Sequence, residues 1–430
     1  MQRTIKTFTV DPQTIKTALL QWSQSFREFL FLDSNDYPDK YGSFRAALAA
    51  DAFTSIATDA YNGFEKLEEY RAATADWIFG YLTYDLKNDT EKLSSSNRDE
   101  LAFPELFFFQ PKKLLFLKEN TLELHYLPLC DDEIDTDFLN ILSQTVPAKA
   151  SSAPFGIHPR TPKPCYLRQV GKMLEHIHRG DIYEANFCME FYAENAVIDP
   201  LDTFVKLNAI SVPPFAAMFR NAQYYALCAS PERYLRKYGS KIISQPIKGT
   251  AARHPDPEAD QMSKSALAAD AKERSENVMI VDLVRNDLSK RAVKGSVTVD
   301  ELCGVYTFNQ VHHLISTISS EVEHNESPVN SIRDSFPMGS MTGAPKISAM
   351  KIIEALEDAK RGLYSGSLGY FDPAGNFDFN VVIRTILYNA ARQYVSFSTG
   401  SAITAQSTAE AEYEECMLKA RAMMQVLSSS

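Results

Sequence analysis

The sequence predicts an α+β fold, because segments with the two-residue period of strands and segments with the 3.6-residue period of helices both recur along it. Two pairs of alternating runs are each joined by a short turn that contains glycine, which is typical of β-hairpins and therefore of antiparallel pairing. The 430 residues include 45% hydrophobic and 23% charged side chains, as in ordinary globular proteins. The chain is long enough to bury a large core.

Residues 1–143 combine short strands with two helices. The expected strands are Ile5–Val10, Leu106–Phe109, Lys113–Phe116 and Thr121–Leu127, and the expected helices are Ile15–Leu30 and Ser43–Ala50. Residues 87–98 are polar and predict a loop. From Gln144 to Lys163 the sequence becomes rich in Pro, Ser, Ala and Thr and loses its periodicity, which predicts an exposed connecting segment.

From Cys165 onward, longer helices and strands alternate. The expected single elements are the helices Tyr166–His178 and Ala266–Lys290 and the strands Ile182–Tyr192 and Tyr394–Thr399. One hairpin is expected from Tyr224–Lys237 and Lys241–Ile247 around Gly239-Ser240, and another from Leu368–Phe371 and Phe377–Leu387. Ser407, with Glu410 three residues later, forms a capping box that predicts a final helix to about Leu427.

Charge and cysteine content exclude several classes of function. The formal net charge is -11, from 44 basic and 55 acidic residues. The sequence contains no basic stripe with interleaved aromatic residues, so binding to nucleic acid is not expected. The six cysteines form no CxxC pair, which argues against a zinc ribbon and against a disulfide framework. The N-terminus lacks a signal-peptide pattern and no 18-residue apolar run follows, so a cytoplasmic protein without a membrane span is expected.

Two glutamates lie on helical stripes that are otherwise apolar. Glu276 shares a stripe with Ile280 and Leu283, and Glu415 shares one with Leu418 and Ala422. A buried carboxylate must be paired, protonated or bound to a cation. Oxygen ligands from two helices suit Mg²⁺, whereas a carboxylate near a helix start is also stabilised by the helix dipole or by an arginine, and the pattern alone leaves both readings open.

The segment SQPIKGT, residues 244–250, places a lysine at the end of a strand-like run. A three-residue loop at Gly239-Ser240-Lys241 would put Glu232 directly opposite Lys248, whereas a two-residue loop would put them on opposite faces. Side by side, a carboxyl and an amine could act as acid and nucleophile, for which the lysine pKa must fall from its usual value. A solvated lysine is the alternative.

Two other polar patterns remain ambiguous. Asp378, Asn380 and Arg384 alternate onto one face of an expected strand, which could face solvent or bind a carboxylate through the guanidinium. The segment from Gly339 to Ile347 suggests a phosphate loop, but its spacing is wrong and a proline separates its second glycine from Lys346. Nucleotide binding is therefore not expected.

Taken together, a series of motifs resembles the chorismate-utilising enzymes, and within them the component I family of aminodeoxychorismate synthases. The matching segments, in order, are GDIYEANF from Gly180, SPERYL from Ser230, PIKGT from Pro246, ENVMIVDLVRNDLS from Glu276, VHHLIST from Val311, FPMGSMTGAPKISAMKIIEALE from Phe336, RGLYSGSLGY from Arg361, IRT at 383–385 and AEAEYEE from Ala409. Such a series is far more specific than any one motif, and it favours the functional readings above.

The resemblance implies a single large α+β unit of two intertwined subdomains, with a central β-sandwich and outer helices. Residues 165–430 would form the chorismate-binding catalytic region, and residues 1–143, which match weakly, a structural or regulatory part of the same body. Residues 144–164 would then connect two parts of one unit.

The resemblance also implies a reaction. Lys248 would attack C2 of chorismate while the C4 hydroxyl leaves with the help of Glu232 as general acid. Ammonia would then add at C4 and expel the lysine, giving 4-amino-4-deoxychorismate. Anthranilate synthases usually carry alanine at the position of Lys248, which argues against that related activity.

Further residues receive roles in the same way. Glu276 and Glu415, with Glu412 nearby, would bind Mg²⁺, which also holds the ring carboxylate. The residues expected to line the substrate pocket are Thr250, His313, Thr342, Tyr364, Arg384 and Gly400. Ser401 and Ala402 depart from the glycine-rich run that relatives carry there.

The resemblance bears on partners and on rival functions as well. Isochorismate and salicylate synthases carry a water-activating lysine where this chain has Glu184, which argues against that activity. No segment resembles a glutamine amidotransferase, so ammonia is expected from solution or from a separate glutaminase subunit. Component I of anthranilate synthase and a non-catalytic chorismate-binding subunit are the alternatives.

Overall fold

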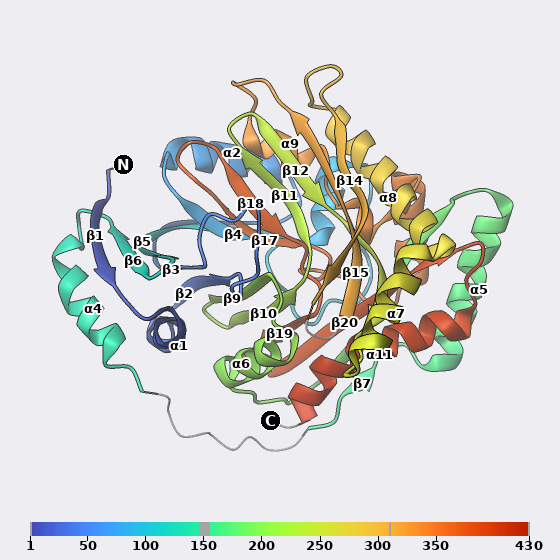
Figure 1. Cartoon of the computed structure of the whole chain (residues 1–430), viewed down its shortest axis with the longest axis horizontal. Helices are drawn as coiled ribbons and strands as arrows, with labels where there is room; N and C mark the ends of the chain where they lie inside the picture. The colour runs from blue at the N-terminus through green and yellow to red at the C-terminus, as the bar shows by residue number, and fades with distance from the viewer. Residues whose placement is uncertain (1, 146–154, 309–310, 429–430) are drawn as a thin grey trace.

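The computed structural model describes residues 2–145, 155–308 and 311–428. The structure contains both helices and strands, and the paired strands in these ranges run antiparallel in one hydrogen-bonded network. The α+β prediction is confirmed. Figure 1 shows α1 and α4 beside the first strands near the N-terminus, and α5, α7, α8 and α11 together on the opposite side of the molecule.

The elements of the N-terminal part alternate between short helices and the strands that they cover. The strands are β1 (Thr4–Thr9), β2 (Glu28–Asp33), β3 (Ala46–Thr58), β4 (Ile78–Leu82), β5 (Leu106–Lys118) and β6 (Thr121–Tyr126), and the helices are α1 (Pro12–Ser23), α2 (Gly63–Thr74), α3 (Lys87–Thr90) and α4 (Ile134–Leu142).

The remaining elements build the larger part of the sheet and its helical cover. The strands are β7 (His158–Pro159), β8 (Glu184–Ala193), β9 (Phe215–Asn221), β10 (Tyr224–Ser230), β11 (Arg233–Tyr238), β12 (Lys241–Gln245), β13 (Ile247–Ala252), β14 (Thr298–Thr307), β15 (Val311–Glu321), β16 (Gly343–Ala344), β17 (Ser367–Phe371), β18 (Phe377–Asn380), β19 (Thr385–Asn389) and β20 (Tyr394–Thr404). The helices are α5 (Lys163–Arg179), α6 (Pro200–Ser211), α7 (Pro257–Ala269), α8 (Ala271–Ser289), α9 (Pro328–Arg333), α10 (Lys346–Leu356) and α11 (Ala409–Ser428).

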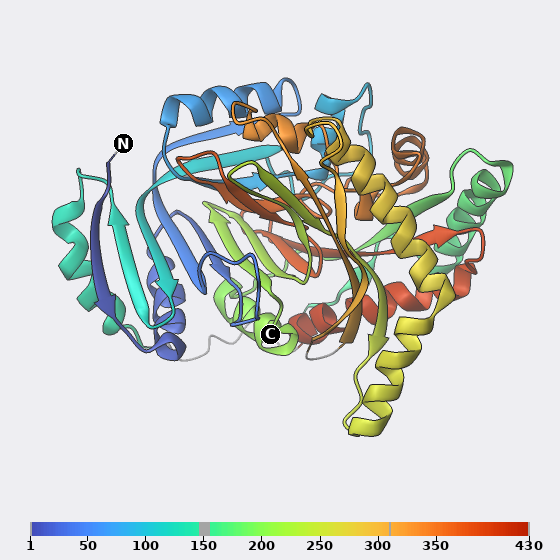
Figure 2. The same cartoon turned by 45° about the horizontal axis from the view of Figure 1, so that its top comes forward.

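The N-terminal strands belong to the same sheet as the later ones. β2 pairs with β3 and, on its other edge, with β9, while β4 pairs with β5 and with β17. Two layers face each other where Tyr81 of β4 and Phe107 of β5 pack edge-on against Phe219 of β9. In Figure 2, the helices α7 and α8 lie along one side of the strands that follow.

Several expected boundaries are wrong, and burial explains the largest error. The expected helix at Ser43–Ala50 is the start of β3, whose residues Ala46–Ala50 are buried and pair with β2 on one edge and β5 on the other. Pairing and burial on both sides override the helix propensity of alanine. The helix expected over Ile15–Leu30 ends at Ser23, and β2 takes up its last residues.

Local backbone chemistry divides three other segments. Asp270 is extended and accepts a hydrogen bond from the N–H of Glu273, so the helix expected over 266–290 is two helices, α7 and α8. Pro231 follows the end of β10, and β11 begins two residues later. The run expected as one strand from Phe377 splits into β18 and β19, with Arg384 at a φ of 53° between them.

The hairpin between β11 and β12 has a two-residue loop. Tyr238 pairs with Lys241, and Gly239 adopts a φ of 60°, so the three-residue loop considered from the sequence is wrong. Within the expected connecting segment, residues 146–154 lie outside the described residues, and β7 and the first residue of α5 follow them. In the described ranges, none of the helices combines the length and apolar character needed to cross a membrane.

Candidate active site

Lys248 lies on β13, where the pairing with β15 is irregular between Ile247 and Thr250. Such a bulge re-aims a side chain. Gly249 makes this possible, because its φ is 92° and a Cβ there would lie 2.9 Å from a methyl group of Leu314. Lys248 Nζ reaches Glu184 Oε1 of β8 at 3.1 Å, and the two side chains are only 10% and 2% exposed.

The surroundings of Lys248 keep its amine charged. Burial by itself lowers the pKa of Lys248, but the negative charges of Glu184 and Glu276 outweigh it, so that the pKa is raised above its ordinary value. The lowered pKa that a nucleophile requires is therefore absent from the free protein. The proton must leave Lys248 at a later stage if the amine is to react.

Glu232 occupies the turn between β10 and β11 and is 4% exposed. Burial raises its pKa to about 7, against the opposing effects of a hydrogen bond from Ser340 and of the Lys248 charge. The carboxyl is thus largely protonated at slightly acidic pH and can donate a proton. The direct cross-strand pairing that a three-residue loop would give is not observed, since Arg233 pairs with Gln245, but the charge of Lys248 still acts on Glu232.

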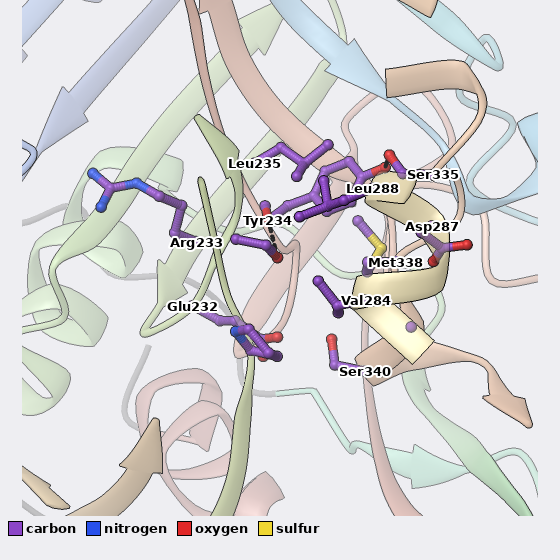
Figure 3. Close-up of a pocket in the computed structure, with 13 residues that line it drawn as sticks. Glu232, Arg233, Tyr234, Leu235, Val284, Asp287, Leu288, Ser335, Met338 and Ser340 are labelled. Carbon is purple, nitrogen blue, oxygen red and sulfur yellow. Dashed lines mark hydrogen bonds between the residues drawn. The ribbon is translucent and has the colours of Figure 1, made fainter. Parts of the chain in front are cut away.

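A small cavity lies beside Glu232. It has a volume of about 20 Å³, sufficient for about one water molecule. Figure 3 shows Glu232 and Ser340 at one end of it and Val284 of α8 on one side, whereas Arg233 points away. Glu232 and the first residue of β11, Arg233, thus face different surroundings, and Arg233 forms ion pairs with Asp39 and Asp378.

Glu276 projects from the first turns of α8 as a buried carboxylate. Its Oε1 atom is buried and receives no hydrogen bond, although Lys272 Nζ lies 3.7 Å away. Burial raises the pKa of Glu276 to about 7, partly offset by the charge of Lys248. A buried carboxylate oxygen that receives no hydrogen bond is a suitable ligand for a hard cation.

The other two glutamates expected to bind metal lie on α11. Glu415 is 44% exposed and pairs with Lys419 at 2.6 Å, and Glu412 is buried. Both act electrostatically on Lys272, as does Glu276, so the three carboxylates converge on one region. Within the described residues, no group of three or more Asp, Glu, His or Cys side chains is placed to hold a metal by itself. Substrate and water oxygens would have to complete a magnesium shell.

Thr250, His313 and Arg384, three residues expected to bind substrate, lie near one another. Thr250 Oγ1 lies 2.9 Å from His313 Nδ1, and burial lowers the pKa of His313 to about 3, so that its ring is neutral. Arg384 donates to the carbonyl of Lys419 at 3.2 Å. Its charge also acts on His313, which places both side chains in one region.

Three further residues that were expected to line the substrate pocket, Thr342, Tyr364 and Gly400, lie in the interior of the protein. Thr342 is fully buried, and its hydroxyl donates to the carbonyls of Met338 and Gly339. Tyr364 is buried beside the Cys188 thiol, which lies 3.8 Å from its hydroxyl. A Cβ at Gly400 would lie 2.6 Å from Cys188 Sγ, so glycine allows β20 to approach β8.

Two structural features were not anticipated from the sequence. Lys419 pairs with Glu415 and donates to the carbonyl of Gly400 at 2.8 Å, which connects the two residues. Its spacing of four residues from Glu415 on a helix could have predicted the ion pair. Ser401, which with Ala402 departs from the glycine-rich run of relatives, is fully buried beside Tyr166 and Cys416. Its side chain therefore packs into the core.

Comparison with known proteins identifies the family. The chain matches the chorismate binding enzyme family over residues 27–425. It belongs to this family. It is 41% identical to aminodeoxychorismate synthase component 1 of Escherichia coli over 262 residues, which is 61% of this chain and 57% of that protein. It is 32% identical to the probable chloroplastic aminodeoxychorismate synthase of rice (Oryza sativa subsp. japonica) over 433 residues, which covers 90% of this chain and 48% of that one.

Anthranilate synthases are also similar to this chain. Component 1 from Thermus thermophilus is 31% identical over 358 residues, covering 81% of this chain and 77% of that protein. The solved structure of anthranilate synthase component I from Streptococcus pneumoniae matches with a TM-score of 0.79 at 22% identity, covering 90% of this chain and 93% of that one. The chain thus shares the family fold and spans about half the length of the two aminodeoxychorismate synthases named above.

Proposed function

We propose that the protein catalyses the Mg²⁺-dependent amination of chorismate by ammonia to 4-amino-4-deoxychorismate, toward para-aminobenzoate and folate. One observation carries the proposal: a buried lysine amine, Lys248, lies in the same region as Glu232, a carboxyl whose pKa burial raises to about 7. A nucleophile and a proton donor are the two groups that the reaction requires. Relatives named aminodeoxychorismate synthase support it.

The reaction proceeds by two displacements. The Lys248 amine forms a bond to C2 of chorismate while the C4 hydroxyl leaves as water with the proton of Glu232. Ammonia then bonds to C4, and the electron pair of the C2–N bond returns to Lys248. Arg384 and neutral His313 and Thr250 hold the carboxylates and ring of the substrate.

Glu276, Glu415 and Glu412 are the residues that would hold Mg²⁺. The fit rests on the buried Glu276 Oε1 atom that receives no hydrogen bond and on the convergence of the three carboxylates. When bound, the ion would neutralise these charges and orient the ring carboxylate of chorismate. A charge of this kind also compensates an anionic substrate in a protein with a net charge of -11.

Ammonia is proposed to come from a separate glutamine amidotransferase subunit, in keeping with the name component 1 of the Escherichia coli relative. The reaction is proposed to take place in the cytoplasm, since the six cysteines are free thiols, as in a reducing compartment.

Anthranilate synthase component I is the second candidate, because relatives of that name match most of the chain. A non-catalytic chorismate-binding subunit is the third. The experiment incubates the protein with chorismate, Mg²⁺ and a concentrated ammonium salt at mildly alkaline pH, beside Lys248→Ala, and identifies products by mass spectrometry. Aminodeoxychorismate from the wild type, reduced at least 100-fold in the variant, supports the proposal.

Anthranilate as product would instead favour the second candidate. Measurable chorismate binding without turnover, with ammonium present, would favour the third.

A further inference from the structure

In the free protein Lys248 is protonated and paired with Glu184, so the first displacement cannot start from this state. An ammonium group has no lone pair, so Lys248 must lose a proton before it attacks. Its side chain is 10% exposed and that of Glu184 is 2% exposed, which leaves little access for water to remove the proton. The acceptor therefore has to come from the site itself.

Resting on the proposed function, we infer that Glu184 is the base that takes the proton from Lys248 Nζ before the attack and returns it afterwards. The distance from Nζ to Glu184 Oε1 is 3.1 Å, within the range for proton transfer along a hydrogen bond. The other oxygen, Oε2, is buried and receives no hydrogen bond. Proteins rarely leave a buried carboxylate oxygen unsatisfied except where it has a function.

The proton balance closes within the pair. One N–H bond breaks on Lys248 and one O–H bond forms on Glu184, so that an ion pair becomes a neutral amine and a neutral acid. When a substrate covers the site, the loss of remaining water disfavours separated charges and therefore favours the neutral pair. After ammonia has displaced the lysine, the neutral amine recovers its proton from Glu184.

The backbone holds Glu184 in a fixed position for this task. Glu184 begins β8, where it pairs with Ala344 of β16 on one side and with Thr404 of β20 on the other. Gly343 permits the first contact, since a Cβ there would lie 2.2 Å from the carbonyl oxygen of Glu184. A base on a strand paired at both edges has a well-defined distance to its partner.

A structural ion pair is the competing interpretation, and pH separates the two. Glu184→Gln removes the base but keeps the shape, so Lys248 must then lose its proton to solvent. We expect kcat to fall about 100-fold or more at pH 7. The ratio of wild-type to variant kcat should then decrease about tenfold for each pH unit up to pH 9. Glu232, Glu276 and Glu415 also act on Lys248, but both proteins carry them, so their effects cancel in the ratio.

Two variants complete the test. Glu184→Asp keeps a base at a longer distance, so its kcat is reduced while its ratio to the wild type stays constant with pH. Glu190→Gln removes another carboxylate of the same strand, one that is 12% exposed and paired with Arg160 away from the site, and should leave kcat within about twofold. The same series without ammonia, read by intact mass, follows formation of the Lys248 adduct of chorismate minus water.

Three outcomes decide the inference. A pH-dependent ratio for Glu184→Gln, with the adduct slowed in parallel, supports it. Activity of Glu184→Gln equal to the wild type, or reduced by a factor that does not change with pH, overturns the inference alone. A wild type that forms neither aminodeoxychorismate nor adduct overturns both the inference and the proposed function.

Discussion

At the scale of single residues, burial and charge act on two neighbouring groups of the site through different causes, and both groups tend to hold a proton. Burial keeps a proton on Glu232, while neighbouring carboxylates keep one on Lys248. The sequence motifs suggested both residues. Counting residues along the hairpin did not: Gly239-Ser240 is a pair typical of a two-residue loop, which gave no contact between them, and the shift in register near Arg233 leaves no recognisable sequence signal.

The raised pKa of Glu232 predicts a pH dependence. A general acid works in its protonated form, so with a pKa of about 7 the wild-type kcat/KM should decline about tenfold per pH unit above pH 7. Glu232→Gln cannot donate a proton and should lower kcat/KM about 100-fold near pH 6, without that decline. Steady-state kinetics with chorismate and ammonium between pH 6 and 9 measures both. If the ratio of wild-type to Glu232→Gln kcat/KM does not change between pH 6 and 9, Glu232 is not the general acid.

Glu276 predicts a link between stability, pH and magnesium. Its pKa is about 7 in the folded protein and 4.5 ordinarily, so the folded state holds the extra proton and stability falls as pH rises from about 4.5 to about 7. Without Mg²⁺, Glu276→Gln should therefore be more stable than the wild type at pH 8 by up to about 3 kcal/mol, the free-energy equivalent of that pKa difference. Chemical denaturation at pH 5 and pH 8 measures this.

Magnesium should reverse the order of stability of the wild type and Glu276→Gln at pH 8. Because the ion binds the ionised carboxylate, Mg²⁺ should raise the Tm of the wild type more at pH 8 than at pH 6, and not that of Glu276→Gln. Glu414→Gln, on the exposed side of α11 and paired with Lys163, is the matched control and should keep the magnesium response. An equal response in Glu276→Gln would place the ion elsewhere.

At the scale of elements, α8 carries Glu276 and also fixes the strand that bears Lys248. The amide of Asn277 donates to the carbonyls of Lys248 and Leu314, and its oxygen accepts from Ser316. The sequence predicted a helix here from its apolar stripe but ran it through Asp270. A capping aspartate inside a periodic stretch is compatible with either one helix or two, and only the tertiary contacts decide.

Asn277→Ala should therefore damage both stability and catalysis. It removes the hydrogen bonds to the carbonyls of Lys248 and Leu314 and the one from the Ser316 hydroxyl, which costs about 2–3 kcal/mol. It also loosens the backbone at Lys248, so that kcat should fall about tenfold. Asn286→Ala, at an exposed position of the same helix, should change neither. Denaturant unfolding and steady-state kinetics measure the two effects, and normal kcat in Asn277→Ala would show that α8 does not position the lysine.

At the scale of the whole molecule, the sheet joins segments that lie far apart in the sequence. Arg233, nearly fully buried, forms ion pairs with Asp39 from the N-terminal part and with Asp378 from β18. Local periodicity predicted strands such as β1, β8 and β20 but missed β2, β4 and β9. It could not predict which strands pair either, because β2 meets β9 and β4 meets β17 across more than 150 residues. The prediction of one body came from the family resemblance, whose motifs lie almost entirely after residue 165.

This architecture predicts that residues 155–430 do not fold alone. Without β2 and β4, the edges of β9 and β17 expose unpaired backbone groups, and the apolar face around Phe219 loses Tyr81 and Phe107. We expect this fragment to aggregate and to lack a cooperative thermal transition, as judged by size-exclusion chromatography and circular dichroism. Coexpression with residues 1–154 should restore a soluble complex, because the missing strands then pair across the break in the chain. A monomeric 155–430 fragment with a sharp transition would instead mean that the N-terminal strands are an addition to a self-sufficient catalytic unit.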